Sequence, residues 1–245
     1  PGEPGPPGAD CAGIWTETTS ASCAGESAFG MAPGSLGVQV CANVLFMPPK
    51  AMPISFEAAS TTPTVFVTVQ IALETALGMQ GKDSLLVHAA AGSIGLAALQ
   101  LSAMYGCKCL GSAGGAGKRT LVRKFGAGYA VGSRDTKYAE SLACAPGGSF
   151  SGGVLNSLTS AGFLAASLST MCLQASFVEI GKREVWGYHR VTMERADVAY
   201  YVWATDFLPV AANSLLSLYP LACVLAHGLV SPLGQIAYSI GAAPT

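Results

Sequence analysis

Two kinds of segment alternate through the middle of the chain. Short apolar runs are each followed, after a turn that often contains glycine, by a longer segment with apolar residues three or four positions apart. The short runs have the length of buried strands, and the longer spacing is that of an amphipathic helix. Strands that alternate with helices predict an α/β fold with a doubly wound parallel sheet.

This pattern predicts a nucleotide-binding Rossmann domain over residues 73–206. The predicted strands cover residues 84–88, 108–112, 129–131, 153–156, 176–181 and 199–204. The predicted helices cover residues 94–105, 118–125 and 162–170, and Gly126 is expected to end the second of them; a further helix is predicted beyond this domain, at residues 211–226.

The flanking segments have other patterns. Residues 26–72 contain short apolar pieces separated by glycine and proline, which predict short strands at 38–40 and 44–46, and then a buried helix at 64–77. Residues 1–25 open with three collagen-like triplets, too few for a triple helix, and we expect a disordered or artefactual segment there. Residues 207–245 carry no Asp, Glu, Lys or Arg, but prolines interrupt them, so we favour a packed helix and loop over a membrane span.

Charge and cysteine content narrow the possible partners and compartment. The net charge is −1 and charged residues are only 11%, which gives no electrostatic reason to expect nucleic acid or an acidic membrane as a partner. The low charge fits a sheet buried on both faces, and it also fits a piece cut from a larger assembly. The eight cysteines include no C-x-x-C pair, so we expect no metal site and an intracellular compartment, the cytoplasm by default and a plastid as the alternative.

The sequence AAAGSIG directly follows the predicted strand 84–88 and opens the predicted helix. A dinucleotide pyrophosphate binds at such a strand–turn–helix unit, where glycines admit the backbone close to the phosphates. The motif lacks the first glycine of G-x-G-x-x-G, so the alternative is a turn without a ligand. The predicted contacts come from Ala89, Gly92, Ser93, Ile94 and Gly95.

The residues beyond this turn favour NADPH over NADH. Sites for NAD place an acidic residue about 20 positions after the glycines, but no Asp or Glu occurs between Asp83 and Asp135. Ser112 ends the second strand and Lys118 follows it, and a hydroxyl and a cation suit a 2′-phosphate. A solvated basic helix face is the alternative. Arg134 and Asn156 complete the predicted cofactor-binding set.

Residues 87–101, VHAAAGSIGLAALQL, closely resemble the cofactor turn of enoyl reductase domains in modular type I polyketide synthases. These domains belong to the zinc-free branch of the medium-chain dehydrogenase/reductase superfamily. Further segments resemble the family in the expected order, and the resemblance runs from about residue 26 to about residue 241. These segments are residues 26–34, 55–68, 155–160, 177–183, 197–200 and 206–209.

The resemblance implies NADPH-dependent reduction of a trans-2-enoyl thioester. The substrate would arrive on the phosphopantetheine arm of an acyl carrier domain, among neighbouring synthase domains. The family's proton-handling lysine falls on Lys182 and its companion aspartate on Asp206. The resemblance also implies that residues 26–72 and 207–245 are parts of a β-rich, GroES-like substrate lobe.

The chain departs from the family in two respects. The family has a tyrosine in the helix between the lobes, and this chain lacks it. Val69, Gln70 and Ile71 occupy the corresponding neighbourhood. Both ends of the substrate lobe are short, so we expect a chain truncated at both ends, and the alternative to an active reductase is a fragment that is inactive in isolation. Two alternatives therefore stay open: a free-standing NADPH:quinone oxidoreductase and a non-catalytic structural fragment of a synthase.

Overall fold

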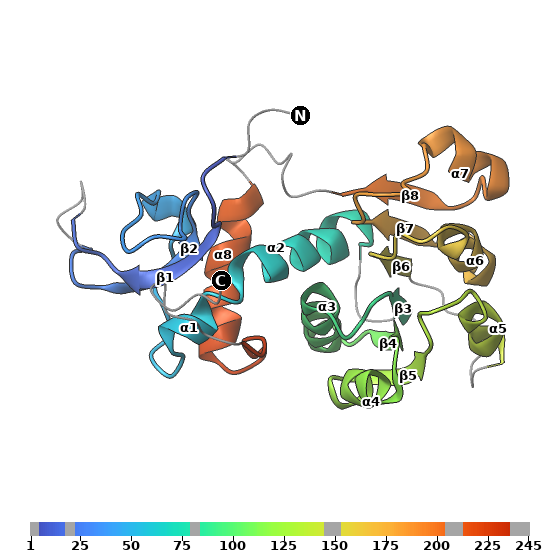
Figure 1. Ribbon diagram of the computed structural model, residues 1–245, viewed down its shortest axis with the longest axis horizontal. Helices are drawn as coiled ribbons and strands as arrows, with labels where there is room; N and C mark the ends of the chain where they lie inside the picture. Colours follow the sequence, from blue (N-terminus) through green and yellow to red (C-terminus); the bar gives the residue numbers. More distant parts are fainter. Residues whose placement is uncertain (1–4, 18–22, 79–83, 145–152, 204–212, 236–245) are drawn as a thin grey trace, which may run out of the picture. The chain divides into compact units, whose positions relative to one another are not determined.

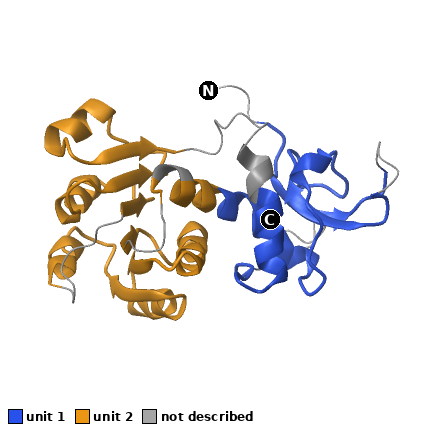
Figure 2. Cartoon of the chain, turned by 180° about the vertical axis from the view of Figure 1, so that it is seen from behind, with its two compact units in different colours: residues 1–67, 209–245 blue, residues 68–208 orange. Residues whose placement is uncertain are grey.

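A computed structural model describes residues 5–17, 23–78, 84–144, 153–203 and 213–235. The chain divides into two compact units, which Figure 2 colours separately. Unit 1 comprises residues 1–67 and 209–245, and unit 2 comprises residues 68–208. The predicted boundaries of the nucleotide-binding domain, residues 73 and 206, lie a few residues inside those of unit 2.

Unit 2 is built on a six-stranded parallel sheet in the order β5-β4-β3-β6-β7-β8. The strand order reverses between β3 and β6, and in such sheets ligands bind outside the carboxyl ends of the strands at this reversal. The strands are β3 (Ser84–Val87), β4 (Lys108–Ser112), β5 (Ala127–Val131), β6 (Gly153–Asn156), β7 (Ser176–Glu179) and β8 (Ala199–Val202).

Helices cover both faces of this sheet. Figure 1 shows α3 (Ser93–Met104) and α4 (Ala116–Lys124) on one face. The other face carries α5 (Tyr138–Ala143), α6 (Phe163–Thr170) and α7 (Tyr188–Glu194). This arrangement confirms the predicted doubly wound α/β fold, and it explains why the central residues of the strands are mainly apolar.

The core between the sheet and the helices α5, α6 and α7 contains large apolar side chains. Leu86, Val154 and Phe177 come from three neighbouring strands and are fully buried. Phe163 of α6 stacks on Tyr138 of α5, with ring centroids 5.7 Å apart. These contacts pack α5 and α6 against this face of the sheet.

Unit 2 contains elements that the pattern did not predict. Helices α5 and α7 have only six and seven residues, and each buries one or two side chains, too few to show a helical period. The predicted helix over residues 64–77 consists of α2 (Pro63–Ile71), which begins in unit 1, and a π-helical turn, η2 (Ala72–Ala76).

Unit 1 corrects two expectations about the N-terminal part of the chain. Residues 1–25 contain a strand, because β1 (Asp10–Ile14) pairs antiparallel with β2 (Ser27–Met31). The Asp10 carboxylate also accepts a hydrogen bond from the Thr64 amide. Residues 44–46 form a 3₁₀ turn, η1 (Val44–Phe46), and not a strand. The Asn43 side chain caps this turn by accepting a hydrogen bond from the Leu45 amide.

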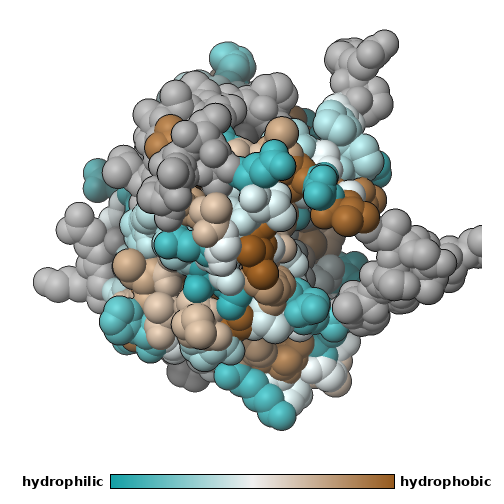
Figure 3. All heavy atoms as spheres, turned by 90° about the vertical axis from the view of Figure 1, so that its left-hand side faces the viewer, coloured by the Kyte–Doolittle hydropathy of each residue, from teal (hydrophilic) through white to brown (hydrophobic). Residues whose placement is uncertain are grey.

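No regular element occurs at residues 38–40, where a strand was expected. Unit 1 also contains α1 (Phe56–Ala59) and α8 (Asn213–Ala226), and α8 continues through Pro220. Within the described ranges, no helix is both long and apolar enough to cross a membrane. Figure 3 shows a face on which hydrophobic patches are separated by hydrophilic residues.

Close packing at Gly95 predicts a sharp difference between two glycine substitutions. In Gly95→Ala, the new Cβ would lie 2.4 Å from Ala90 Cα, so helix α3 must move away from the turn. We expect the free energy of unfolding to fall by about 1–3 kcal/mol, as for other overpacked sites. Urea unfolding followed by circular dichroism measures the change.

Gly117→Ala is the matched control. Gly117 lies in α4 and a Cβ there meets nothing within 4 Å, so the substitution should raise the free energy of unfolding by about 0.5–1 kcal/mol. Equal effects of the two substitutions would contradict the packing described at Gly95.

Candidate functional site

The turn between β3 and α3 presents backbone to solvent at the carboxyl end of β3. Ala89 has a positive φ of 47°, and Gly92 is the exposed N-cap of α3 with φ −82° and ψ 171°. No side chain caps this helix, so its first-turn N–H groups are available to an anion. Ser93 is exposed at the first position of the helix, and Ile94 is half-buried beside it.

Backbone hydrogen bonds hold the turn in this shape. The Ala90 amide donates to the Ser112 carbonyl at 2.8 Å, and the Gly92 amide donates to the Ala89 carbonyl at 2.8 Å. Gly95 packs directly on Ala90. The five residues predicted from the AAAGSIG motif therefore lie together in one turn, as the motif requires.

Ser112 lies beneath this turn and is fully buried. Its Oγ accepts a hydrogen bond from the Ala89 amide at 3.3 Å and lies 2.9 Å from Nδ1 of His88. The hydroxyl thus already has two partners within the protein. Its contact with a cofactor phosphate stays a prediction, and its observed role is to support the turn from below.

His88 connects the turn to the helices on the other face of the sheet. Its Nε2 lies 2.8 Å from Ser167 Oγ, and Ser167 Oγ lies 2.7 Å from the Tyr138 hydroxyl. The Tyr138 hydroxyl also donates to the Phe163 carbonyl at 2.8 Å. Burial lowers the pKa of His88 to about 3, so the imidazole stays neutral and both its nitrogens can serve in this network.

Sequence reasoning missed this network. The sequence signal is a histidine directly after a mainly apolar run, because a polar side chain that is buried there needs hydrogen-bond partners. Nothing local to Tyr138 or Ser167 indicates that they supply it, because they are 50 and 79 residues away along the chain.

Two arginines lie beside Gly114, in the loop that follows β4. The Nη1 of Arg119 donates to the Gly114 carbonyl at 3.2 Å. The Nε of Arg134 lies so close to Gly114 that a Cβ built there would be only 2.8 Å from it. Lys118 is exposed on the first turn of α4, next to Arg119. Two guanidinium groups at the carboxyl end of β4 are chemically suited to a phosphate.

Asn156 and Glu179 form a buried pair at the carboxyl ends of β6 and β7. The Asn156 Nδ2 donates to Glu179 Oε2 at 2.6 Å, and the Gly181 amide donates to Glu179 Oε1 at 2.6 Å. Burial raises the pKa of Glu179 to about 7, although both hydrogen bonds oppose this rise. Sequence reasoning missed Glu179, and the predicted contact of Asn156 with the cofactor stays a prediction.

The structure describes only one of the two predicted catalytic residues. Lys182 is exposed in the loop directly after β7, at the carboxyl edge of the sheet. Asp206 lies outside the described residues, so its pairing with Lys182 stays a prediction. In the part of the chain that is described, no three His, Cys, Asp or Glu side chains gather as metal ligands.

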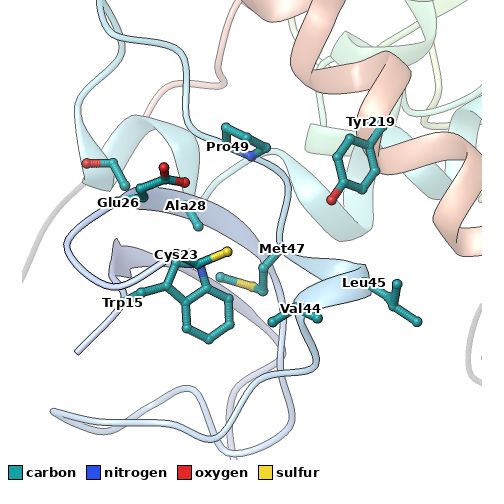
Figure 4. A pocket seen from close by; sticks show the side chains of 10 residues that line it. Trp15, Cys23, Glu26, Ala28, Val44, Leu45, Met47, Pro49 and Tyr219 are labelled. Carbon is teal, nitrogen blue, oxygen red and sulfur yellow. The ribbon is translucent and has the colours of Figure 1, made fainter. Parts of the chain in front are cut away.

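Unit 1 contains a separate cavity of about 230 Å³. Figure 4 shows Trp15, Cys23 and Met47 around it, with Tyr219 contributed by α8. Its lining is mainly apolar, with Glu26 as the acidic residue among the lining side chains. None of the described candidate site residues lines this cavity.

The buried network predicts a pH-dependent effect of His88→Ala. At pH 7.5 the substitution should lower the free energy of unfolding by about 2–4 kcal/mol, because it leaves a cavity and removes partners of Ser112 and Ser167. The unfolded chain binds a proton at His88 below about pH 6.5, whereas the folded chain does so only near pH 3. The wild type should therefore lose stability relative to the variant as the pH falls.

Urea unfolding of both proteins at pH 7.5 and pH 5 measures this difference. A stability difference that does not shrink at the lower pH would contradict the buried, neutral state of His88.

Comparison with known proteins finds similarity to short segments of large synthases. No protein-family model matches it. It is 32% identical over 198 residues to the spectinabilin polyketide synthase system protein NorB of Streptomyces orinoci, a match that covers 79% of this chain and 9% of that protein. It is 35% identical over 175 residues to the highly reducing polyketide synthase ALT1 of Alternaria alternata, covering 70% of this chain and 7% of that protein. The chain spans a tenth or less of the length of these two relatives.

Solved structures share the fold. The CurK enoyl reductase superposes with a TM-score of 0.86 at 26% identity, covering 94% of this chain and 70% of that chain. The Escherichia coli quinone oxidoreductase, solved in complex with NADPH, superposes with a TM-score of 0.81 at 22% identity, covering 94% and 73% of the two chains. With the Rossmann sheet and the glycine turn, these matches show that the chain belongs to the family of polyketide synthase enoyl reductase domains, which have a quinone oxidoreductase-like fold.

Proposed function

We propose that this chain reduces the carbon–carbon double bond of a trans-2-enoyl thioester with NADPH. The substrate is carried on the phosphopantetheine arm of an acyl carrier domain in the same synthase. The observation that carries the proposal is the uncapped N-terminus of α3, which follows an exposed glycine turn at the reversal of strand order.

The residues around the turn fit a phosphorylated dinucleotide. The exposed backbone at Gly92 and Ser93 can approach a pyrophosphate, and α3 directs its positive dipole end toward it. The sequence has no Asp or Glu from residue 84 to residue 134, so no carboxylate from this segment repels a 2′-phosphate. Arg134 and Arg119, beside Gly114, supply the cationic groups that such a phosphate requires.

The proposed role of Lys182 is proton delivery. Bound NADPH supplies the hydride, which is added to the β-carbon of the substrate. Negative charge then develops on the thioester enolate, and an ammonium group nearby both stabilises this charge and donates a proton to the α-carbon. Lys182 lies in the loop after β7, at the edge of the sheet where such folds bind their ligands. Asp206 is proposed to orient it.

Quinone reduction is the second candidate, favoured by the similarity to the Escherichia coli quinone oxidoreductase. The higher identity to the CurK enoyl reductase and the matches to polyketide synthases favour the thioester. Assays with an enoyl thioester and with a soluble quinone distinguish the two, and turnover of the quinone alone would overturn the proposed substrate.

The arginine pair predicts selective binding of NADPH. Calorimetric titration should give at least tenfold tighter binding of NADPH than of NADH. Arg134→Gln should weaken NADPH binding by about tenfold and leave NADH binding unchanged, because it removes a charged partner of the 2′-phosphate alone.

Arg190→Gln is the control, because Arg190 belongs to α7, which Figure 1 shows on the opposite face of the sheet, and its guanidinium group lies over the Trp186 ring. It should leave both affinities unchanged. Equal affinity of the wild type for NADPH and NADH would contradict the proposal that the arginine pair binds the 2′-phosphate.

The proposed proton donor predicts a separation of turnover from cofactor binding. Lys182→Ala should lower kcat with an enoyl thioester by about 100-fold or more, with the NADPH dissociation constant changed less than twofold. Lys124→Ala removes an exposed lysine at the end of α4 and should change neither quantity. Unchanged kcat in Lys182→Ala would remove this lysine from the mechanism.

A further inference from the structure

A buried carboxylate lies directly beneath the loop that carries Lys182. Glu179 is the last residue of β7 and is only 2% exposed. Its two carboxylate oxygens accept hydrogen bonds of 2.6 Å, one from Asn156 Nδ2 and one from the Gly181 amide. Glu179 therefore joins the neighbouring strand β6 to the backbone one residue before Lys182.

The orientation of the Asn156 amide is fixed by its other contacts. Its Oδ1 accepts a hydrogen bond from the Leu158 amide at 3.1 Å, and its Nδ2 donates to the Leu158 carbonyl at 3.1 Å. The nitrogen must therefore face Glu179, and Glu179 must offer an acceptor. In addition, the Ile180 amide donates to the Asn156 carbonyl at 2.9 Å. The chain segments that leave β6 and β7 are thus joined by two hydrogen bonds, one from Asn156 to Glu179 and one from Ile180 to Asn156.

The backbone at Gly181 packs against the same carboxylate. A Cβ at Gly181 would lie 2.7 Å from Glu179 Oε1 and 3.2 Å from Thr159 Cγ2, so the loop has no room for a side chain there. A side chain at position 181 could therefore be accommodated only if the Glu179 carboxylate or the loop moved. Lys182 emerges to the surface immediately afterwards.

We propose that Glu179 and Asn156 are positioning residues that fix the loop from which Lys182 reaches the substrate. This inference rests on the proposed role of Lys182 in proton delivery. Both side chains are buried beneath this loop, so in this proposal they act through the backbone that carries Lys182. The lysine side chain is a flexible four-carbon stem, so its ammonium group can be placed accurately only if the backbone that carries it is fixed. A displacement of the ammonium group by about 1 Å costs on the order of 100-fold in rate.

The test uses a reversal of the hydrogen-bond polarity. In Glu179→Gln the amide oxygen can still accept from Gly181, but its NH₂ group then faces the NH₂ group of Asn156. We expect kcat with an enoyl thioester to fall ten- to 100-fold, with the NADPH dissociation constant unchanged. In the double variant Asn156→Asp with Glu179→Gln, the new amide donates to the new carboxylate, and part of the lost kcat should return, although the Leu158 carbonyl loses the donor that Asn156 supplied.

A second readout does not depend on turnover. Competitive labelling of lysines with acetic anhydride, read by mass spectrometry, reports the environment of each ammonium group. The labelling rate of Lys182 relative to Lys137 should change at least threefold in Glu179→Gln and return toward the wild-type value in the double variant. Lys118 is the internal control and should not change.

Gly181→Ala keeps both partners and is the second variant, in case the first fails to fold. Its methyl group pushes the loop off the carboxylate, so the same changes in kcat and labelling are expected. Circular dichroism and cooperative unfolding establish that each variant is folded.

The outcomes separate this inference from the proposed function. Wild-type kcat and wild-type Lys182 labelling in folded Glu179→Gln and Gly181→Ala would overturn the positioning role, while a large loss in Lys182→Ala would keep the proposed function. A reduced kcat without recovery in the double variant, and without any change in Lys182 labelling, would also overturn it. Wild-type activity of Lys182→Ala would instead refute the lysine's role, and the positioning role with it.

Discussion

The contact between Gly95 and Ala90 is the constraint on which the cofactor edge of the sheet depends. Because Gly95 has no side chain, α3 can begin against the turn that precedes it, and a Cβ there would lie 2.4 Å from Ala90 Cα. The helix therefore directs its uncapped N-terminus outward from the end of β3. A helix start displaced from this turn would no longer present those N–H groups beside the exposed glycine.

Buried polar pairs hold the exposed groups in place at two points of this edge. Beneath the turn, His88 links Ser112 to Ser167 across the sheet. Beneath the lysine loop, Glu179 links Asn156 to Gly181. Buried polar networks stabilise one arrangement because any other leaves a group without a partner. The surface residues proposed to meet cofactor and substrate are thus positioned by residues that meet neither.

The sequence predicts what depends on local pattern. The alternation of apolar runs with helical spacing gave the doubly wound sheet, and the AAAGSIG motif located the turn. Elements held by distant partners were missed: β1 exists because it pairs with β2, and the short helix α5 is held by the stacking of Tyr138 on Phe163. In the sequence, Glu179 looks like a surface residue close to Lys182. Its hydrogen bond with Asn156 forms only because the folded sheet places β6 beside β7. Pairing across 23 residues leaves no local signal.

Isotope transfer tests the central claim most directly, namely that this chain passes hydride from NADPH to an enoyl thioester. The chain would be incubated with NADPH that carries deuterium at the transferable position of the nicotinamide, together with a crotonyl thioester of pantetheine. The account predicts a saturated thioester with one deuterium at the β-carbon, detected by mass spectrometry and NMR. Tight NADPH binding with no deuterium in the thioester would contradict it.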